Sequence, residues 1–555
     1  MSFANDLSGP ADSNVRQTLF SYTSGRFIYN ETKRLAERYV VFNVAALKEA
    51  VCKHTGRSRV TSLAKLAEGR FNRVFLLALD DGLQVIVKIP FHNSLPKQFA
   101  TASEVATLSF LRTKGVPVPK VYGWSSVADN EVGTEYIVMD YVSGVGLDTK
   151  WYNLTRQEQT TVAIQIVEVE RILFNIPFGS YGSIYFKKNI PPKLQSNLYV
   201  HGFKDPLGDS DIFCIGPTVD YRFWHGKRAE MQVDRGPWRN PHEYLAAIGK
   251  RELEWTYRYG KPLEGDFPFN KIQPGMVYPG AYCALLEKYI SMSPFLLPRD
   301  TRHPGNSPTL RHPEVPDAYN DKDLTPSDVF ISPETFKISG IIDWQHTVIV
   351  PRLLASGHPR LFKSPDGTPP PTPGAPQPPD GYESLDPESK AQVDELLRRR
   401  YLYYFYDVFN RAKNHIHMIA CANSLLEPRK QLVDYAGRQW NGSLISLRGA
   451  LIQMCEWWAL LQERSWETCP ITFTAAEVKE QEAHEPIFFD FTGLINCWRE
   501  GIGGMSDNGW VKTEVYEQAA MQNRELKERL LENADPVEFD KIQRGWPFQD
   551  KEEFL

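Results

Sequence analysis

The chain has 555 residues, of which 42% are hydrophobic and 24% are charged, and its formal net charge is −5 at pH 7. This length and apolar content predict two or three packed subdomains with a large core, and they exclude a disordered chain. A mildly negative charge without a basic tail or stripe argues against nucleic acid as the main partner. No apolar run approaches the roughly 18–20 residues of a membrane helix, so no membrane span is expected.

The cysteines and the N-terminus indicate a cellular compartment. The 7 cysteines are scattered and form no C-x-x-C pair, which favours a reduced intracellular compartment and argues against structural zinc. The N-terminus lacks the apolar core of a secretion signal. The segment Arg16–Arg26 has the composition of a weak transit peptide, but the acidic residues Asp6 and Asp12 argue against one. Residues 1–42 are therefore expected to be an ordinary, flexible N-terminal extension.

Residues 43–142 have the pattern of a small nucleotide-binding lobe. A short amphipathic helix is predicted from Asn43 to His54, ending at Gly56. Three strands, one helix and two further strands follow, and Asp80-Asp81-Gly82 is the predicted hairpin turn. The strands are Val60–Leu66, Arg73–Leu79, Leu83–Ile89, Val118–Trp124 and Glu135–Val142, and the helix is Gln98–Arg112. This order predicts an antiparallel sheet with one helix.

The rest of the chain has mainly helical patterns. Residues 143–363 are expected to form a large catalytic lobe with helices at Arg156–Phe174, Pro241–Tyr259 and Ala281–Ser291. Proline crowds residues 364–381, which predicts an extended surface loop without packing of its own. Residues 382–555 are predicted to complete the large lobe. Their helices are Asp386–Ala420, Asn441–Arg464 and Lys512–Asn533. The predicted fold class is α+β, a bilobal protein-kinase-like fold with a small antiparallel β lobe and a large, mainly helical lobe.

Three carboxylates have the layout that phosphoryl transfer requires. The stretch Asp323-Leu-Thr-Pro-Ser-Asp328 precedes Ile341-Ile-Asp343-Trp344, and short strands at Val329–Ile331 and Phe336–Ile342 predict a hairpin between them. In kinases a loop Asp orients the substrate hydroxyl, and two further oxygen ligands hold Mg²⁺ against the phosphates. Asp323 is the candidate for the first role, and Asp328 and Asp343 for the second. The alternative is that all three are ordinary surface acids.

Lys88 lies inside the apolar strand Val85–Pro90. A lysine is almost never fully buried without a partner, so either it points to water from an edge strand or it has a function. The functional interpretation is a lysine that binds the ATP phosphates and is held by Glu104 of the following helix. The alternative for Glu104 is a solvated helix acid.

Three further residues are candidates for binding the nucleotide. Gly69 lies in the turn between the first two strands, where a glycine lets backbone N–H groups approach phosphate oxygens. One glycine is weak evidence, because most strand turns contain one. Met139 and Tyr141 end the last strand of the small lobe, where backbone groups would bind the adenine ring.

Together these residues resemble the aminoglycoside phosphotransferase (choline-kinase-like) superfamily, and within it the fungal phosphotransferase group that includes the altered-inheritance-of-mitochondria proteins. The resemblance runs from about Phe20 to Arg360. It is carried by Glu68-Gly-Arg-Phe-Asn-Arg-Val-Phe75, Val87-Lys-Ile-Pro90, Tyr181-Gly-Ser-Ile-Tyr185, Arg235-Gly-Pro-Trp238 and Ile341-Ile-Asp-Trp344.

The resemblance implies ATP- and Mg²⁺-dependent phosphorylation of a hydroxyl on an unknown small molecule, in the mitochondrion or the cytoplasm. By position, Asp323 would be the catalytic base, Asp343 the metal ligand, Lys88 the phosphate ligand and Glu104 its partner.

The chain departs from the superfamily pattern around this core. The superfamily loop usually reads His-x-Asp-Leu-x-x-x-x-Asn, whereas Asp321 occupies the His position here and Asp328 the Asn position. Gln345 occupies the place of a second acid. The core set favours an active small-molecule kinase, and the departures favour a pseudokinase that binds nucleotide or a protein partner without turnover.

Overall fold

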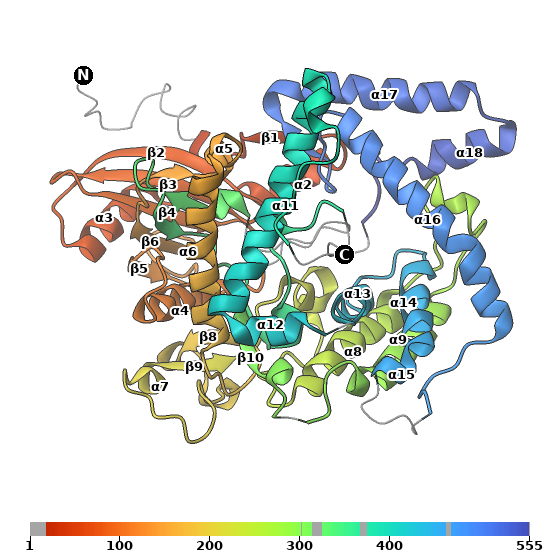
Figure 1. Cartoon of the computed structure of the whole chain (residues 1–555). Coiled ribbons are helices and arrows are strands. Elements are labelled where there is room, and N and C mark those ends of the chain that lie inside the picture. Colours follow the sequence, from red (N-terminus) through yellow and green to blue (C-terminus); the bar gives the residue numbers. More distant parts are fainter. Residues whose placement is uncertain are drawn as a thin grey trace.

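The computed structural model of the protein describes residues 18–300, 302–312, 325–366, 374–423, 425–461 and 468–553. These residues form a small lobe built on a β-sheet and a larger, mainly helical lobe, which lie side by side in Figure 1. The predicted bilobal α+β, protein-kinase-like fold is confirmed. None of the described helices is both long enough and apolar enough to cross a membrane.

The small lobe is organised around a five-stranded antiparallel sheet with the strand order β2-β3-β4-β6-β5. Its strands are β2 (Val60–Glu68), β3 (Asn72–Leu79), β4 (Gln84–Pro90), β5 (Val121–Ser125) and β6 (Tyr136–Asp140). In the register of this sheet Lys88 of β4 is paired with Val74 on one side and Ile137 on the other. Lys88 therefore lies on the central strand, which excludes the interpretation as an edge-strand lysine.

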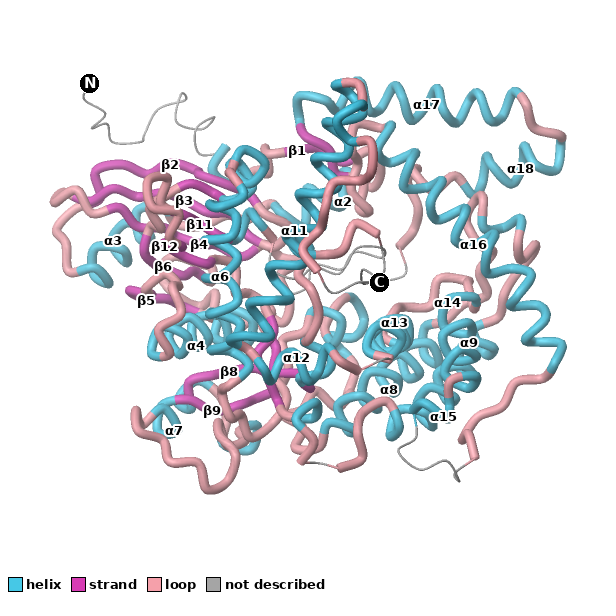
Figure 2. The backbone as a smooth tube through the Cα atoms, in the orientation of Figure 1, coloured by secondary structure: helices cyan, strands magenta, loops and turns pink. Residues whose placement is uncertain are grey.

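Two helices cover the two faces of this sheet (Figure 2). Helix α3 (Val44–Thr55) begins where the Asn43 side chain accepts hydrogen bonds from two backbone N–H groups, and it ends at Gly56, whose φ is 69°. It packs against the outer face of the sheet. Helix α4 (Phe99–Thr113) carries Glu104 and is buried along nearly its whole length, because the sheet and strand β8 (Ser183–Phe186) both contact it.

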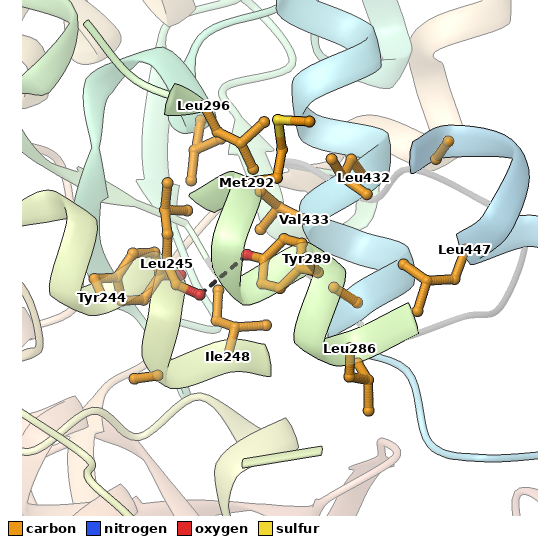
Figure 3. Packing of buried hydrophobic residues seen from close by; sticks show 14 of the residues in the cluster. Tyr244, Leu245, Ile248, Leu286, Tyr289, Met292, Leu296, Leu432, Val433 and Leu447 are labelled. Carbon is orange, nitrogen blue, oxygen red and sulfur yellow. Dashed lines mark hydrogen bonds between the residues drawn. The ribbon is translucent and has the colours of Figure 1, made fainter. Parts of the chain in front are cut away.

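The core of the large lobe lies between helices that are far apart in sequence. Helices α6 (Arg156–Phe174) and α8 (Pro241–Tyr259) begin and end where predicted, and α9 (Pro279–Met292) differs by only a few residues. Figure 3 shows α8 and α9 packed against α13 (Leu426–Ala436) and α14 (Ile445–Glu456), with Tyr289 buried among leucines. The Tyr289 hydroxyl donates a hydrogen bond of 3.0 Å to the carbonyl of Leu245, which satisfies its only polar group.

Small strands between the lobes position the candidate acids. Strand β11 (Val329–Ile331) pairs with β12 (Ile338–Ile341) on one side and with β7 (Val145–Gly146) on the other. The pairing of β11 with β12 is the hairpin that the sequence predicted. Strands β10 (Pro308–Arg311) and β13 (Val348–Pro351) form a second pair. The N–H of Ile342 bonds to the carbonyl of Asp328 at 2.9 Å, so the ends of the hairpin are fixed side by side.

The C-terminal part differs from the prediction in two interrupted helices and three unpredicted ones. The helix predicted from Asp386 to Ala420 is broken at Asn414 into α11 (Pro387–Lys413) and α12 (His415–Cys421). The segment 441–464 is likewise interrupted near Trp457, where α14 ends before α15 (Trp458–Leu461). Helices α13, α16 (Ala475–Gly501) and α18 (Pro536–Gly545) were not predicted, whereas α17 (Tyr516–Glu532) matches a predicted helix.

The N-terminal extension, from residue 18 onward, is not a flexible tail. Strand β1 (Gly25–Phe27) pairs with β14 (Trp510–Lys512) near the other end of the chain, and α2 (Glu31–Arg38) follows it. Lys33 of α2 forms an ion pair of 2.8 Å with Glu553. The beginning and the end of the described chain are therefore held together beside the small lobe.

Candidate active site

Lys88 is the residue around which the candidate site is assembled. Its side chain is buried, and Nζ donates hydrogen bonds of 2.7 Å to Oε1 of Glu104 and 3.1 Å to Oδ1 of Asp343. Burial by itself would lower the pKa of Lys88, but the charges of Glu104 and Asp343 outweigh it and raise that pKa. The lysine is therefore charged, and it links a helix of the small lobe to a loop of the large lobe.

Asp343 follows β12 in a constrained backbone conformation. Its φ is 58°, a left-handed value that Asp tolerates better than most residues and that often occurs at functional sites. The next residue, Trp344, is buried and donates a hydrogen bond of 3.0 Å to the carbonyl of Ile341, which fixes the loop. Loss of water would raise the pKa of Asp343, but the Lys88 charge outweighs this effect and lowers it.

Asp328 ends the short 3-10 turn η9 (Pro326–Asp328) beside Asp343. Its Oδ2 accepts hydrogen bonds from the backbone N–H of Thr325 at 3.1 Å and from the Thr325 hydroxyl at 2.6 Å. Burial raises the pKa of Asp328, and the negative charge of Asp343 raises it further. A divalent cation between the two carboxylates would relieve this repulsion.

The two carboxylates fit the usual ligand set of Mg²⁺. No group of three or more His, Cys, Asp or Glu side chains suited to a metal ion is found among the described residues. Mg²⁺ commonly takes only one or two carboxylates and completes its shell with water and substrate phosphates. Asp328 and Asp343 therefore suffice as protein ligands if a nucleotide supplies the remaining oxygens.

A cavity of about 860 Å³ lies in front of these acids. It is walled by both lobes and by α11, and its lining includes cationic, acidic and apolar side chains. The lining residues are Arg70, Phe71, Asp148, Trp151, Tyr152, His312, Thr325, Pro326, Ser327, Asp328, Asp343, Gln345, His346, Leu361, Lys363, Ser364, Pro365, Arg398, Arg399 and Leu402. The beginning of the proline-rich segment thus lines the site, and Asp366 is fixed to α11 by two hydrogen bonds from Arg400.

The residues predicted to bind the nucleotide all lie outside this lining: Gly69, Lys88, Glu104, Met139 and Tyr141. Met139 is in β6 and Tyr141 follows it, at the connection between the lobes. Gly69 separates β2 from β3, and its N–H bonds to the carbonyl of Asn72 at 2.8 Å. An added Cβ at Gly69 would come no closer than 3.7 Å to its nearest neighbour, so the turn itself does not require glycine.

Asp323 and Asp321 lie outside the described residues, but the structure reveals a histidine that the sequence analysis missed. Nε2 of His312 lies 3.1 Å from the carbonyl oxygen of Ile342, and its ring packs edge-on against Trp344 at 4.8 Å. His312 lines the cavity together with both candidate metal ligands. Its signal in the sequence was the His-Pro pair directly after a strand.

Gln345 was predicted only as a departure from the superfamily, yet it connects the lobes. Its Oε1 accepts a hydrogen bond of 3.0 Å from Asn72, and its Nε2 donates one of 2.6 Å to the Ser94 hydroxyl. The neighbouring His346 bonds to the carbonyl of Leu95 at 2.7 Å. Burial lowers the pKa of His346 to about 4, so this ring is neutral at pH 7 and the contact carries no charge.

Comparisons with known proteins identify the family of this chain. The model of a family described as "Phosphotransferase enzyme family" matches residues 62–178. A subtelomeric hrmA-associated cluster protein of Aspergillus fumigatus is 30% identical over 528 residues, covering 88% of this chain and 97% of its own. The chain belongs to the aminoglycoside phosphotransferase superfamily and to its fungal group.

Other members of the fungal group are similar over much of the chain. The mitochondrial protein "Altered inheritance of mitochondria protein 9" of Yarrowia lipolytica is 29% identical and covers 69% of this chain and 66% of its own. The protein of the same name in Candida albicans is 23% identical and covers 97% of this chain and 90% of its own.

Solved structures of superfamily members are more distant. The streptomycin–ATP ternary complex of the aminoglycoside phosphotransferase APH(2")-IIa is 13% identical, with a TM-score of 0.34, and covers 75% of this chain and 97% of its own. The aminoglycoside-3'-phosphotransferase of type VIII is 14% identical, with a TM-score of 0.29, and covers 65% of this chain and 98% of its own.

Proposed function

We propose that the protein is an ATP- and Mg²⁺-dependent phosphotransferase that acts on a hydroxyl group of a small molecule. The observation that carries the proposal is the position of Lys88 between Glu104 and Asp343, at 2.7 and 3.1 Å. A buried lysine that bridges a helix carboxylate and a loop carboxylate beside a cavity is the arrangement that positions ATP phosphates in kinase-like folds.

Each residue has a role in the proposed reaction. Lys88 binds the α- and β-phosphates and Glu104 orients it, while the N–H groups around Gly69 and the backbone of Met139 and Tyr141 bind the rest of the nucleotide. Asp328 and Asp343 would hold Mg²⁺. When bound, this ion supplies positive charge against the phosphates.

In the transfer itself, a bond forms between the acceptor oxygen and the γ-phosphorus. The bond from the γ-phosphorus to the β–γ bridging oxygen breaks, and ADP keeps the electron pair. Asp323 orients the acceptor hydroxyl and takes its proton. Such reactions depend on positioning and on fixed charge rather than on covalent chemistry by the protein.

His312 provides a histidine ring next to the catalytic loop, although this chain has Asp321 where the superfamily pattern His-x-Asp has its histidine. His312 contacts the backbone of Ile342 and the ring of Trp344, and it therefore braces the Asp343 loop as a loop histidine does. On this assignment the residues from 313 to 322 are an insertion between the histidine and Asp323.

A pseudokinase is the second candidate, and one observation favours it. Asp328 caps its own turn through Thr325, and its pKa is raised, so part of its ligand capacity is already used. A pseudokinase would keep the fold for binding nucleotide or a protein partner without turnover.

Purified protein incubated with Mg-ATP separates the two candidates. An active enzyme hydrolyses ATP slowly without an acceptor, and Asp343→Ala abolishes this hydrolysis. Asp129→Ala, in an exposed turn of the small lobe, is the matched control and keeps it. Nucleotide binding without turnover in the native protein would support the pseudokinase. An unbiased metabolite screen for incorporated phosphate then identifies the acceptor.

Two relatives of the fungal group are named as mitochondrial proteins, and we propose the same location for this protein. Fractionation of cells that express the full chain tests the proposal. Recovery in the cytosolic fraction alone would contradict it.

A further inference from the structure

The side of the cavity formed by helix α11 and Lys363 is basic. We define the α11 wall as Lys363, Arg398 and Arg399, of which the last two belong to helix α11 and all line the cavity. The acidic lining residues Asp328 and Asp343 are the candidate metal ligands, and a bound Mg²⁺ would offset both charges. Asp148 is the remaining acid of the described lining.

Arg398 has an unused donor in this wall. Its Nε and Nη2 each donate a hydrogen bond of 2.7 Å to Glu395 in the preceding turn, and its guanidinium lies 5.3 Å from the ring centre of Tyr152. Its Nη1 is buried and has no hydrogen-bond partner among the described residues. A buried donor without a partner is destabilising, so a rotation of the Arg398 side chain that brings Nη1 to an anion in the cavity would be favoured by a charge-assisted bond.

The neighbouring charges add to the preference for an anion. Arg399 lies 3.7 Å from the same Glu395, and its side chain is 60% exposed, so one carboxylate is shared by two guanidinium groups. Lys363 adds a third cation. Together with Asp148 and Glu395, the wall retains an excess of positive charge, which repels a polycationic acceptor and attracts an anionic one.

The floor beside this wall is apolar. Trp151 and Leu402 are buried and line the cavity next to Leu361. An acceptor that fills this part of the cavity would place an apolar body on these side chains and a charged group on Arg398. The arrangement resembles most ligand pockets, in which a few polar groups orient a molecule against an apolar lining.

We propose that the α11 wall binds a carboxylate or phosphate group of the acceptor, so that the substrate is an anionic, hydroxyl-bearing small molecule with an apolar body. This inference rests on the proposed phosphotransfer function and names the substrate class of the same site. Arg398 is the main specificity residue, and Arg399 and Lys363 strengthen the positive electrostatic potential around it.

Three probes of similar shape and different charge test the inference. Phenyllactate is anionic, phenylpropanediol is neutral and phenylalaninol is cationic, and each carries a hydroxyl and an apolar ring. Calorimetric titration into the full chain loaded with Mg-ADP should show that phenyllactate binds about tenfold tighter than the other two, a difference of about 1.4 kcal/mol. Glycerol phosphate in the same assay distinguishes a phosphate preference from a carboxylate preference.

Variants on one helix locate the binding site. Arg398→Gln and Arg399→Gln should each reduce the preference for phenyllactate, the first more strongly. The control Arg411→Gln lies on the same helix and removes a similar exposed pair, with Asp407, and it should change nothing. Equal or tighter binding of phenylalaninol, or an unchanged preference in Arg398→Gln, would overturn the inference.

The same samples distinguish this inference from the proposed function. Binding of Mg-ADP is measured first, and its absence would contradict the phosphotransferase. The probes are also titrated into nucleotide-free protein, so the charge preference is measured in either case. Anion binding that is lost in Lys88→Ala but kept in Arg398→Gln would place the anion in the phosphate site of the nucleotide and would refute a role for the α11 wall.

Discussion

Nζ of Lys88 lies 3.1 Å from Oδ1 of Asp343, although the two residues are 255 positions apart. Lys88 belongs to the central sheet of the small lobe and Asp343 to a loop of the large lobe. The structure therefore has both lobes closed on a preformed charge pair. Because catalysis of phosphoryl transfer relies on positioned charge, little rearrangement of these groups is needed before ATP can bind.

Lys88→Met should abolish binding of Mg-ATP and should also destabilise the fold. The substitution leaves the Glu104 carboxylate buried without its partner, and breaking such a pair typically destabilises by about 3–5 kcal/mol. The double variant Lys88→Met/Glu104→Leu should recover most of that stability, but it should not recover binding of Mg-ATP. Chemical unfolding measures the first effect, and the thermal shift induced by Mg-ATP measures the second. A single variant with the full ligand-induced shift would show that Lys88 does not bind phosphate.

Asp328→Asn separates the kinase from the pseudokinase. If Asp328 binds Mg²⁺, the amide keeps an oxygen but loses a charge, and more Mg²⁺ is needed for the same activity. If Asp328 is a degenerate position, the amide removes repulsion against the phosphates and ATP binds more tightly. ATP affinity across a Mg²⁺ titration decides between them. Superimposable curves would mean that this side chain does not contact the metal.

The raised pKa of Asp328 predicts a pH dependence of metal binding. Only the ionised carboxylate binds Mg²⁺, so the requirement for Mg²⁺ should grow as the pH falls from neutrality toward this raised pKa. The sign follows because protons and the metal compete for the same oxygens. The amide side chain of the Asp328→Asn variant does not titrate, so the Mg²⁺ requirement of this variant should change less with pH. Equal pH dependence in both proteins would contradict the assignment.

Asp323→Asn should keep nucleotide affinity and lose turnover. A positioned general base is worth about 10²–10⁴-fold in rate, and the substitution removes the base without changing size. His312→Ala should also lower turnover, because the Asp343 loop loses its brace, whereas His312→Asn should recover part of it through a retained hydrogen bond. Single-turnover kinetics with Mg-ATP measure both. An Asp323→Asn enzyme within a few-fold of the native rate would remove Asp323 from the mechanism.

Gln345→Leu should loosen the connection between the lobes. Asn72 and Ser94 would each lose a partner in a buried place, and an unsatisfied buried polar group typically destabilises by about 1–3 kcal/mol. Because Asn72 begins the strand after the Gly69 turn, Mg-ATP affinity should fall as well. Gln431→Leu, on an exposed face of α13, is the control. Unchanged stability and affinity in Gln345→Leu would show that this bridge has no role in positioning the turn.

The amino-acid sequence by itself determined the elements that depend on local chemistry. Asn43 and Gly56 mark the ends of α3, the apolar alternation marks the strands, and the spacing of Lys88 and Glu104 predicted their ion pair. These signals are readable because caps, turns and strand periodicity depend on neighbouring residues. Helix α16 was missed although Thr474 and Glu477 form a capping box at its start, because its apolar residues are spread around a helix that contains Pro486.

Only the tertiary structure decided which distant residues share the candidate site. His312 lies beside Trp344, Gln345 reaches Ser94, and Arg398 faces the cavity from a helix far along the chain. No local pattern encodes these contacts, because they depend on how the two lobes and α11 pack against one another. The same packing places the His312 ring against the loop that carries Asp343, and it brings the basic residues of α11 to the cavity. The sequence indicated the phosphotransferase core, and the long-range packing determined the chemistry around it.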